Sequence, residues 1–213
     1  EDEGSQLLAM LLDAKRGEMV VDFCAGAGGK TLALGAMMRN TGRLYAFDTS
    51  AHRLDAFKSR FKRSGLSNVH PACISNENDL RVKRLSGKID RVLVDAPCSG
   101  LGTLRRNPDL KWRQTPQGVE ELTHKQRDIL AGAARLVKPG GRLVYATCSM
   151  LAEENEAVVD AFLAVHADFH RLNALELLAQ QSIVISGDGP DMRLLPHIHG
   201  SDGFYAAVLE RVK

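Results

Sequence analysis

The sequence predicts a single α/β domain in which helices cover both faces of a doubly wound, mostly parallel β-sheet. Three observations lead to this fold class. Short apolar runs alternate with segments of helical periodicity, a glycine-rich loop follows the first run, and several runs end in an acidic residue or a cysteine. Ligand sites of open α/β sheets form where strands end in this way. A chain of 213 residues is long enough to bury the core of one such domain.

The strands and helices are predicted from two different periodicities. Each expected strand is a short apolar run bounded by turn-forming or charged residues. These runs cover residues 19–23, 43–47, 68–74, 89–94, 142–146 and 204–209. Each expected helix carries apolar residues on one face at helical spacing. The helices cover residues 5–14, 32–39, 51–65, 119–137 and 153–166.

Capping and helix-breaking residues predict where these elements begin and end. Ser5 and Ser50 are the expected N-caps of the first and third helices. The run Lys138-Pro139-Gly140-Gly141 is expected to end the long fourth helix. Two polar segments, 76–87 and 101–117, are expected to be loops, the first with room for a short helix. The second is longer than an ordinary turn, which is typical of a functional loop.

Charge and composition limit the possible partners. The net charge of +2 and the pI near 8.4 are weakly basic, so a nucleic-acid partner is allowed but not required. No apolar run is long enough to span a bilayer and no signal peptide is recognisable, so we expect no membrane partner. Because the sequence begins at Glu1, we expect it to be a fragment. We also expect a monomer.

The four cysteines are too far apart to indicate a structural role of their own. They lack the local pairs of a structural zinc site, and a domain of this size does not depend on a disulfide framework. We therefore expect no bound metal and a reducing, cytoplasmic location. Cys73 lies within an expected strand, where it is predicted to be a small buried apolar residue.

The glycine-rich loop between the first strand and its helix predicts a nucleoside-containing ligand. Gly26, Gly28 and Gly29 let the backbone approach a ligand closely and adopt positive φ. The helix that follows offers unpaired N–H groups to a polar or anionic ligand. Asp48, at the end of the second strand, is placed to accept hydrogen bonds from ribose hydroxyls.

Three ligands are compatible with this loop to different degrees. A phosphate-binding loop needs a glycine where the chain has Cys24, although Gly29-Lys30-Thr31 fits and 89–95 resembles a magnesium-binding strand. A dinucleotide fingerprint needs a glycine where the chain has Thr31. S-adenosylmethionine fits best, because it requires a close backbone approach and a ribose-binding acid without a pyrophosphate cradle. Cys24 is then expected to contact the cofactor through its backbone.

Two cysteine motifs at strand ends predict covalent chemistry. One is Asp95-Ala96-Pro97-Cys98-Ser99-Gly100 and the other is Thr147-Cys148-Ser149. A thiolate that adds to a substrate divides one difficult step into two easier ones, and a neighbouring acid stabilises the charge that develops. From chemistry alone, Cys98 and Cys148 are nearly equal candidates for the nucleophile.

A basic segment follows the first cysteine motif. Arg105, Arg106 and Lys111 are the candidate RNA contacts, because arginine and lysine bind phosphates. Trp112 could stack on a base, but taken alone it is expected to pack into the core. The basic residues of the third helix are expected to form a solvated face, and they are Lys58, Arg60, Lys62 and Arg63. The histidines of the C-terminal segment, His197 and His199, are expected to pack a loop.

Taken together, these motifs resemble the catalytic domain of RNA (cytosine-5) methyltransferases of the Sun and nucleolar-protein type, in particular the bacterial ribosomal RNA enzymes. The resemblance covers nearly the whole chain. It includes residues 22–31, Asp48, both cysteine motifs, Arg105-Arg106-Asn107-Pro108-Asp109 and Gly200-Ser201-Asp202-Gly203-Phe204. It implies a seven-stranded, Rossmann-like fold over residues 1–213 and a missing N-terminal RNA-binding domain.

The resemblance also implies roles for single residues. Cys148 is the nucleophile and Cys98 assists release, while Asp95 lies beside the cofactor and the target base. S-adenosyl-L-methionine is held by the glycine loop, by Asp48 and by Arg53; the loop residues are Cys24, Ala25, Gly26, Ala27, Gly28, Gly29 and Lys30. The implied substrate is ribosomal RNA, with transfer RNA as the alternative.

The chain departs from the family pattern at two places. Residues 26–30 read Gly-Ala-Gly-Gly-Lys, where the family often has Ala-Pro-Gly-Gly-Lys, and we expect cofactor binding to survive the loss of the proline. After the third strand, Asn76 and Glu77 are the candidates for the usual adenine-binding acid. Two other classes of protein, a P-loop-like nucleotide hydrolase and a catalytically silent RNA-binding module, stay as alternatives.

Overall fold

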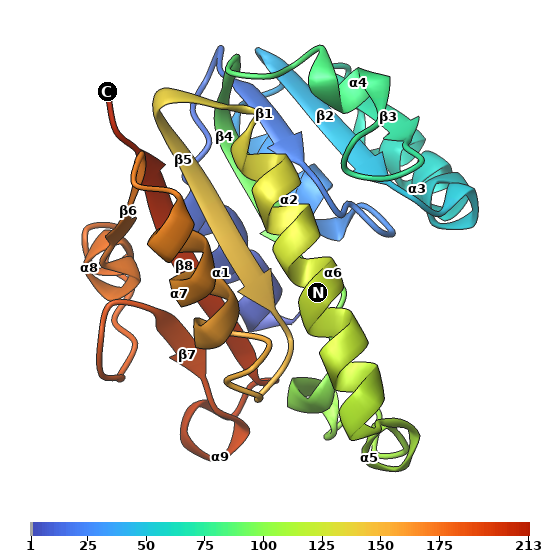
Figure 1. Cartoon of the computed structure of the whole chain (residues 1–213). Helices are drawn as coiled ribbons and strands as arrows, with labels where there is room; N and C mark the ends of the chain where they lie inside the picture. Colours follow the sequence, from blue (N-terminus) through green and yellow to red (C-terminus); the bar gives the residue numbers. More distant parts are fainter. Residues whose placement is uncertain (1) are drawn as a thin grey trace.

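A computed structural model describes residues 2–213, and Glu1 lies outside the described residues. Within them, eight strands form one sheet in the order β3-β2-β1-β4-β5-β8-β6, with β7 also paired to β8 (Figure 1). The strands are β1 Met19–Asp22, β2 Arg43–Asp48, β3 Val69–Cys73, β4 Ile89–Asp95, β5 Val137–Thr147, β6 Phe169–Leu172, β7 Met192–Leu194 and β8 Phe204–Arg211. The α/β prediction is confirmed, but the described sheet has one strand more than the seven expected.

Helices connect the strands. The longer ones are α1 Glu3–Leu12, α2 Gly29–Met37, α3 Ala51–Ser64, α6 Pro116–Ala134 and α7 Glu156–Val165. The shorter ones are α4 Leu80–Lys83, α5 Leu110–Arg113, α8 Ala174–Ala179, α9 Pro196–His199 and the 3₁₀ turn η1 Leu101–Thr103. Within the described residues, no helix is both long and apolar enough to cross a membrane.

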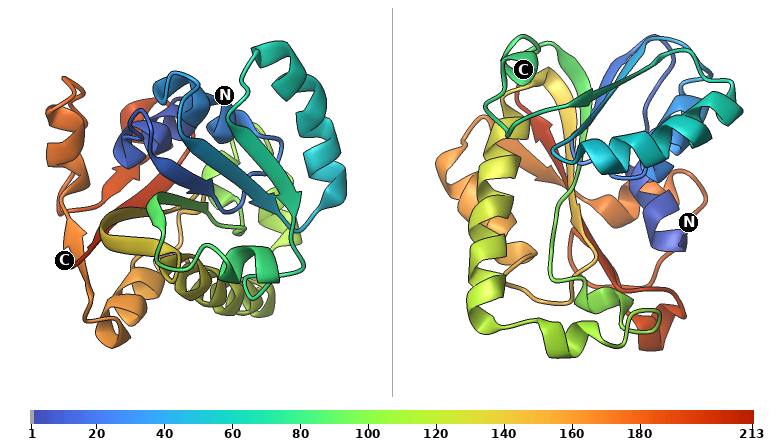
Figure 2. Two further views of the ribbon diagram at one scale, coloured as in Figure 1. Left: turned by 90° about the horizontal axis from the view of Figure 1, so that it is seen from above. Right: turned by 90° about the vertical axis from the view of Figure 1, so that its right-hand side faces the viewer.

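The central strands β3, β2, β1, β4 and β5 pair in parallel, and β8 is antiparallel to β5. Side chains alternate between the two faces of the sheet, as the period of a strand requires. On β5, Leu143 and Tyr145 join one buried core, while Val144 and Ala146 join the other. The first core is closed by α4, α6 and α7, and the second by α1, α2, α3 and α8. In the right-hand view of Figure 2, α6 and α3 lie on opposite sides of the sheet.

The expected boundaries are correct at some helices and wrong at others. Ser50 caps α3 as predicted, because its side chain accepts a hydrogen bond from the Arg53 N–H. Ser5 does not cap α1; it is buried inside that helix, and Asp2 is the N-cap. The expected loop 76–87 contains α4, and the segment 101–117 contains η1 and α5.

The breaker run Lys138-Pro139-Gly140-Gly141 does not end a helix. Helix α6 ends earlier, at Ala134, and the breaker run lies within β5. Val137 pairs with Ile89 but the next pair is Arg142 with Arg91, so the four residues form a bulge in the strand. Gly140 has φ of 74°, a conformation that glycine adopts readily.

The last part of the chain contains four elements that periodicity did not predict. They are β6, α8, β7 and α9. Each is short, between three and six residues, and β6 and β7 are held by antiparallel pairing with β8. Segments of this length are too short for a clear apolar period, so their structure depends on the partner strand.

Asp22 connects the end of β1 to the helix that follows the glycine loop. It ends β1, is 1% exposed, and its Oδ2 accepts a hydrogen bond of 2.6 Å from the Thr31 hydroxyl in the first turn of α2. Burial raises the pKa of Asp22 to about 6, although the bond from Thr31 partly opposes this shift. The folded protein therefore holds this proton more tightly than the unfolded chain does.

We predict that Asp22→Asn becomes more stabilising as the pH rises. The asparagine keeps an acceptor for Thr31 and cannot ionise. In the wild type, Asp22 ionises near pH 4 in the unfolded chain but only near pH 6 in the folded protein, so the free energy of unfolding falls between these two values. The variant's gain in free energy of unfolding should grow by roughly 3 kcal/mol from about pH 4 to pH 7. Urea denaturation across this range, with exposed Asp128→Asn as control, measures the difference. A constant difference would contradict the prediction.

Candidate active site

The two cysteine motifs meet because β4 and β5 are neighbours that run in the same direction. Asp95 at the end of β4 pairs with Ala146 at the end of β5, so the loops that follow emerge side by side. The Cys98 and Cys148 sulfur atoms lie 3.5 Å apart, and either thiol could donate the hydrogen bond. Both thiols are free and partly buried.

The two thiols differ in their affinity for a proton. The hydrogen bond from Cys98 lowers the pKa of Cys148, and Lys30 adds a smaller effect in the same direction, although burial and Asp95 oppose the shift. The same hydrogen bond and burial raise the pKa of Cys98 well above that of an ordinary thiol. If one proton is lost from the pair, the thiolate is therefore favoured at Cys148.

Lys30 links the glycine loop to the first cysteine motif. Its Nζ lies 2.6 Å from Asp95 Oδ2, and both side chains are mostly buried. Lys30 was expected in the cofactor loop; it lies in the first turn of α2 and reaches across to the end of β4. The ion pair places a positive charge beside the carboxylate closest in sequence to Cys98.

A cavity of about 500 Å³ opens beside Asp95 at the carboxyl ends of β1, β2, β3 and β4. Several of the residues predicted to hold a cofactor line this cavity: Cys24, Gly26, Asp48, Arg53, Asn76, Glu77 and Asp95. The predicted residues Ala25, Ala27, Gly28, Gly29 and Lys30 do not line it. The sequence did not indicate Lys125 and Ile129, which reach the cavity from α6. Only their position on the long helix over this sheet edge brings them there.

Asp48 lies in the wall of the cavity and is hydrogen-bonded to the glycine loop. It is 5% exposed, and its oxygens accept hydrogen bonds from the N–H groups of Gly26, at 2.8 Å, and Ser50, at 2.7 Å. Arg53 lies 3.9 Å from the same carboxylate. A carboxylate has further lone pairs, so Asp48 can still accept bonds from a ligand.

The glycines of the loop are required for two different reasons. Gly26 and Gly28 have φ of 53° and 81°, which other residues rarely adopt. A side chain on Gly28 would also collide with the ring of Phe57 in α3. Gly28 therefore packs the loop against α3, while Gly26 lines the cavity. Burial raises the pKa of the Cys24 thiol, as expected of a residue that does not act through its sulfur.

The predicted basic residues divide into two groups. Arg106 donates from Nε, at 2.7 Å, and from Nη2 to the same oxygen, Oδ2, of fully buried Asp202, and Arg105 donates a hydrogen bond to the Gly200 carbonyl. The two arginines fasten the segment after Cys98 to residues 200–204, which we call the C-terminal motif. The side chain of Arg105 is still 49% exposed and that of Arg106 is 57% exposed. Lys111, on α5, is exposed and lies 4.9 Å from the ring centre of Trp112.

The structure contradicts two of the expectations about packing and agrees with a third. Trp112 is 81% exposed, so the prediction that it packs into the core is wrong. Cys73 is also exposed, because β3 is an edge strand, and its predicted burial is wrong. His199 does pack a loop: its Nδ1 lies 2.9 Å from the Leu195 N–H and its Nε2 lies 3.0 Å from the Ser186 carbonyl. Residues 2–213 contain no group of His, Cys, Asp or Glu side chains suited to a metal ion.

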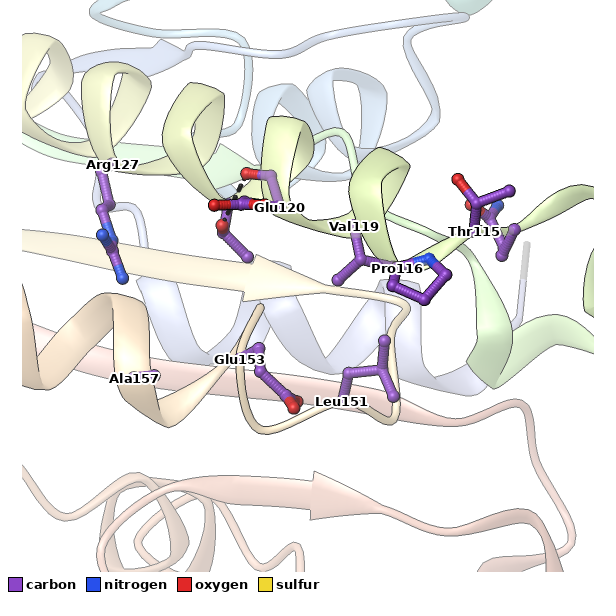
Figure 3. Close-up of a pocket in the computed structure, with 10 residues that line it drawn as sticks. Thr115, Pro116, Val119, Glu120, Arg127, Leu151, Glu153 and Ala157 are labelled. Atoms are coloured by element: carbon purple, nitrogen blue, oxygen red, sulfur yellow. Dashed lines mark hydrogen bonds between the residues drawn. The ribbon is translucent and has the colours of Figure 1, made fainter.

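A polar cluster that no sequence motif indicated lies against the two cysteine loops. Gln126, Glu154 and Asn155 are at most 2% exposed and are hydrogen-bonded to residues beside Cys98 and Cys148. The available signal was the pair Glu154-Asn155 a few residues after the second cysteine motif. Next to this cluster, a second cavity of about 500 Å³ lies between α6 and residues 151–157, with Glu120, Arg127 and Glu153 in its wall (Figure 3).

Comparison with known proteins connects this geometry to one family. The family model of the 16S rRNA methyltransferase RsmB/F matches residues 9–210. The chain is 39% identical over 214 residues to the probable ribosomal RNA small subunit methyltransferase B of Synechocystis, and 36% identical over 211 residues to that of Bacillus subtilis. Each match covers 99% of this chain and 47% of the relative, so the chain spans about half the length of the curated relatives it matches.

A similarity of fold supports the same family. The crystal structure of NSun6 from Pyrococcus horikoshii, solved with SFG, superposes with a TM-score of 0.86 at 30% identity. The match covers 100% of this chain and 53% of that one. The resemblance predicted from the glycine loop and the cysteine motifs is therefore confirmed, and the chain belongs to the 16S rRNA methyltransferase RsmB/F family.

Proposed function

We propose that this chain is the catalytic part of an enzyme that methylates carbon 5 of cytosine in RNA, with S-adenosyl-L-methionine as the methyl donor. The observation that carries the proposal is the contact of two thiols, 3.5 Å apart, beside Asp95. Family membership supports methyl transfer and ribosomal RNA as the substrate. Transfer RNA stays the alternative substrate. Family membership also argues against a P-loop-like hydrolase. The cytoplasmic location and the monomeric state stay predictions.

The cavity beside Asp95 fits S-adenosyl-L-methionine. Gly26 allows close approach of the backbone, and Asp48 offers acceptor capacity for ribose hydroxyls at the cavity wall. Asn76 and Glu77 lie at the end that follows β3, where they would bind the adenine. When bound there, the cofactor supplies an electrophilic methyl group to carbon 5.

Cys148 is the proposed nucleophile. Carbon 5 of cytosine is a weak nucleophile, and addition of the Cys148 thiolate to carbon 6 makes carbon 5 electron-rich. The lowered pKa of Cys148 favours the thiolate that this step needs. A proton held between Asp95 and ring nitrogen 3 would stabilise the negative charge that develops on the ring, and Lys30, 2.6 Å from Asp95, adds a positive charge beside it.

Cys98 is the proposed base for release. While Cys148 is a thiolate, its charge and hydrogen bond keep the proton on Cys98. Once the Cys148 sulfur is bonded to carbon 6, that charge is gone and Cys98 can give its proton to water. The Cys98 thiolate then removes the proton from carbon 5 of the methylated ring. The electron pair left on carbon 5 forms the double bond to carbon 6, and the Cys148 thiolate leaves.

RNA would approach from the side of η1 and α5. The target base must be turned out of its stack, because the thiol needs access to the face of the ring. Arg105, Arg106 and Lys111 are the proposed phosphate contacts. The exposed parts of the two arginine side chains would contact the phosphates, while both arginines stay paired with the C-terminal motif. Exposed Trp112 beside Lys111 adds a face on which a base can stack.

We predict opposite outcomes for the two cysteine variants. Cys148→Ala should abolish methylation of RNA, because no covalent adduct can form. Cys98→Ala should form the adduct but release product slowly, so a protein–RNA complex accumulates on denaturing gels. RNA containing 5-azacytidine should trap the wild type and Cys98→Ala. A trapped adduct with Cys148→Ala, but not with Cys98→Ala, would reverse the assignment. No adduct with any of the three proteins would reject the covalent mechanism.

We predict that Lys111→Ala weakens RNA binding through the loss of one phosphate contact. The slope of log affinity against log salt should become shallower by about 0.7, the value for one contact to a single strand. Filter binding across a salt series measures the slope. Lys62→Ala, on the solvated face of α3, is the matched control and should leave the slope unchanged. Equal slopes for the two variants would remove Lys111 from the RNA surface.

A further inference from the structure

One buried polar cluster holds the residues on both sides of both cysteines. Pro97 and Ser99 flank Cys98, and Thr147 and Ser149 flank Cys148. Each of the four flanking residues is hydrogen-bonded to Gln126, Glu154 or Asn155. We call these three residues the buried clamp. The bonds join Gln126 to Pro97, Glu154 to Ser99, Asn155 to Thr147 and Glu154 to Ser149.

Glu154 is the centre of the buried clamp. It is 0% exposed, and its Oε1 accepts hydrogen bonds from the Ser99 N–H at 2.8 Å and from Gln126 Nε2 at 3.0 Å. Its Oε2 accepts from the Ser99 hydroxyl at 2.5 Å and from the Ser149 hydroxyl. One carboxylate thus binds the residue that follows each cysteine. All of its partners in these bonds are uncharged: a backbone N–H, an amide and two hydroxyls.

The other members of the buried clamp fix Glu154 and the remaining flanks. Gln126 also donates to the Pro97 carbonyl, at 2.9 Å. Asn155 accepts from the Thr147 hydroxyl at 2.5 Å and donates to the Ser149 carbonyl at 3.1 Å. The Tyr145 hydroxyl, from within β5, donates to the Glu154 carbonyl at 2.7 Å. The backbone around each thiol is thereby held from both sides.

A carboxylate buried among neutral hydrogen-bond partners is costly, whereas an amide could fill most of the same bonds without a charge. A glutamate here is explained if its charge and its acceptor-only character have a use. We infer that Glu154 is a positioning residue that holds the Cys98 and Cys148 thiols in contact and directs the negative charge of the pair onto Cys148. The use of that thiolate rests on the proposed function, but the arrangement of the thiols does not.

The electrostatics agree with this geometry. The charge of Glu154 is one of the causes that raise the pKa of Cys98, after the hydrogen bond with Cys148, burial and the charge of Cys148. The charge of Glu154 therefore disfavours a thiolate at Cys98, whereas the hydrogen bond from Cys98 lowers the pKa of Cys148.

Selective alkylation tests the inference without methyl transfer. Iodoacetamide reacts with thiolates, so mass spectrometry of the Cys98 and Cys148 peptides at neutral pH reports which thiol is ionised, with exposed Cys73 as internal reference. The variants are Glu154→Gln and Glu154→Ala. In Glu154→Gln the amide oxygen can accept from the Ser99 N–H and Gln126, while both serine hydroxyls turn to accept from the amide nitrogen. Glu153→Gln is the matched control, because Glu153 is exposed and lines the second cavity (Figure 3).

In the wild type, Cys148 should be alkylated faster than Cys98. The Cys148-to-Cys98 rate ratio should fall by at least about threefold in Glu154→Gln, further in Glu154→Ala, and stay constant in Glu153→Gln. Methylation should lose about 10- to 100-fold in kcat, the range known for outer groups that orient a reactive centre, with KM for S-adenosyl-L-methionine unchanged. A folded Glu154→Gln protein with the wild-type rate ratio would overturn the inference, even if Glu154→Ala fails to fold. Failure of the 5-azacytidine adduct alone would reject the covalent mechanism and leave this result valid.

Discussion

The parallel pairing of β4 with β5 is the constraint on which the rest of the site depends. The register of Asp95 opposite Ala146 brings two loops to the same edge of the sheet. Cys98 and Cys148 are 50 residues apart in the chain, and the contact of their sulfur atoms follows from this register. An antiparallel pair would send the two loops to opposite ends of the sheet. The chemistry proposed for the thiols therefore depends on strand direction.

The ion pair between Lys30 and Asp95 joins this thiol pair to the cavity under the glycine loop. Lys30 begins α2, and Asp22 holds the next residue, Thr31, from inside the sheet. Asp48 holds the other side of the loop through Gly26. Three aspartates at the ends of β1, β2 and β4 thus connect the glycine loop to the sheet edge and the cysteines. A displacement of any one of these strands would therefore move residues of both the cavity and the thiol pair.

The C-terminal motif closes the site from the opposite side. Asp202 is fully buried and paired with Arg106, and the Gly203 N–H donates to the Gly102 carbonyl at 2.8 Å. Gly102 in turn donates to the carbonyl of Cys148, at 2.8 Å. A side chain on Gly102 would collide with both backbones, so close approach requires glycine there. Together with the buried clamp, this junction leaves both cysteine loops little freedom to move.

Features with local signals could be predicted from the order of residues. The glycine loop, the strand-end acids, both cysteine motifs, the Ser50 cap and the central strands all follow from short patterns of residues. How those features meet, and which side chains are buried, depends on contacts that form only in the folded protein. Trp112 and Cys73 are exposed, Arg105 and Arg106 pair with the C-terminal motif, and Glu154 lies under the thiols. Burial and pairing are contacts between distant segments, and no local pattern of residues specifies which distant segment will supply them.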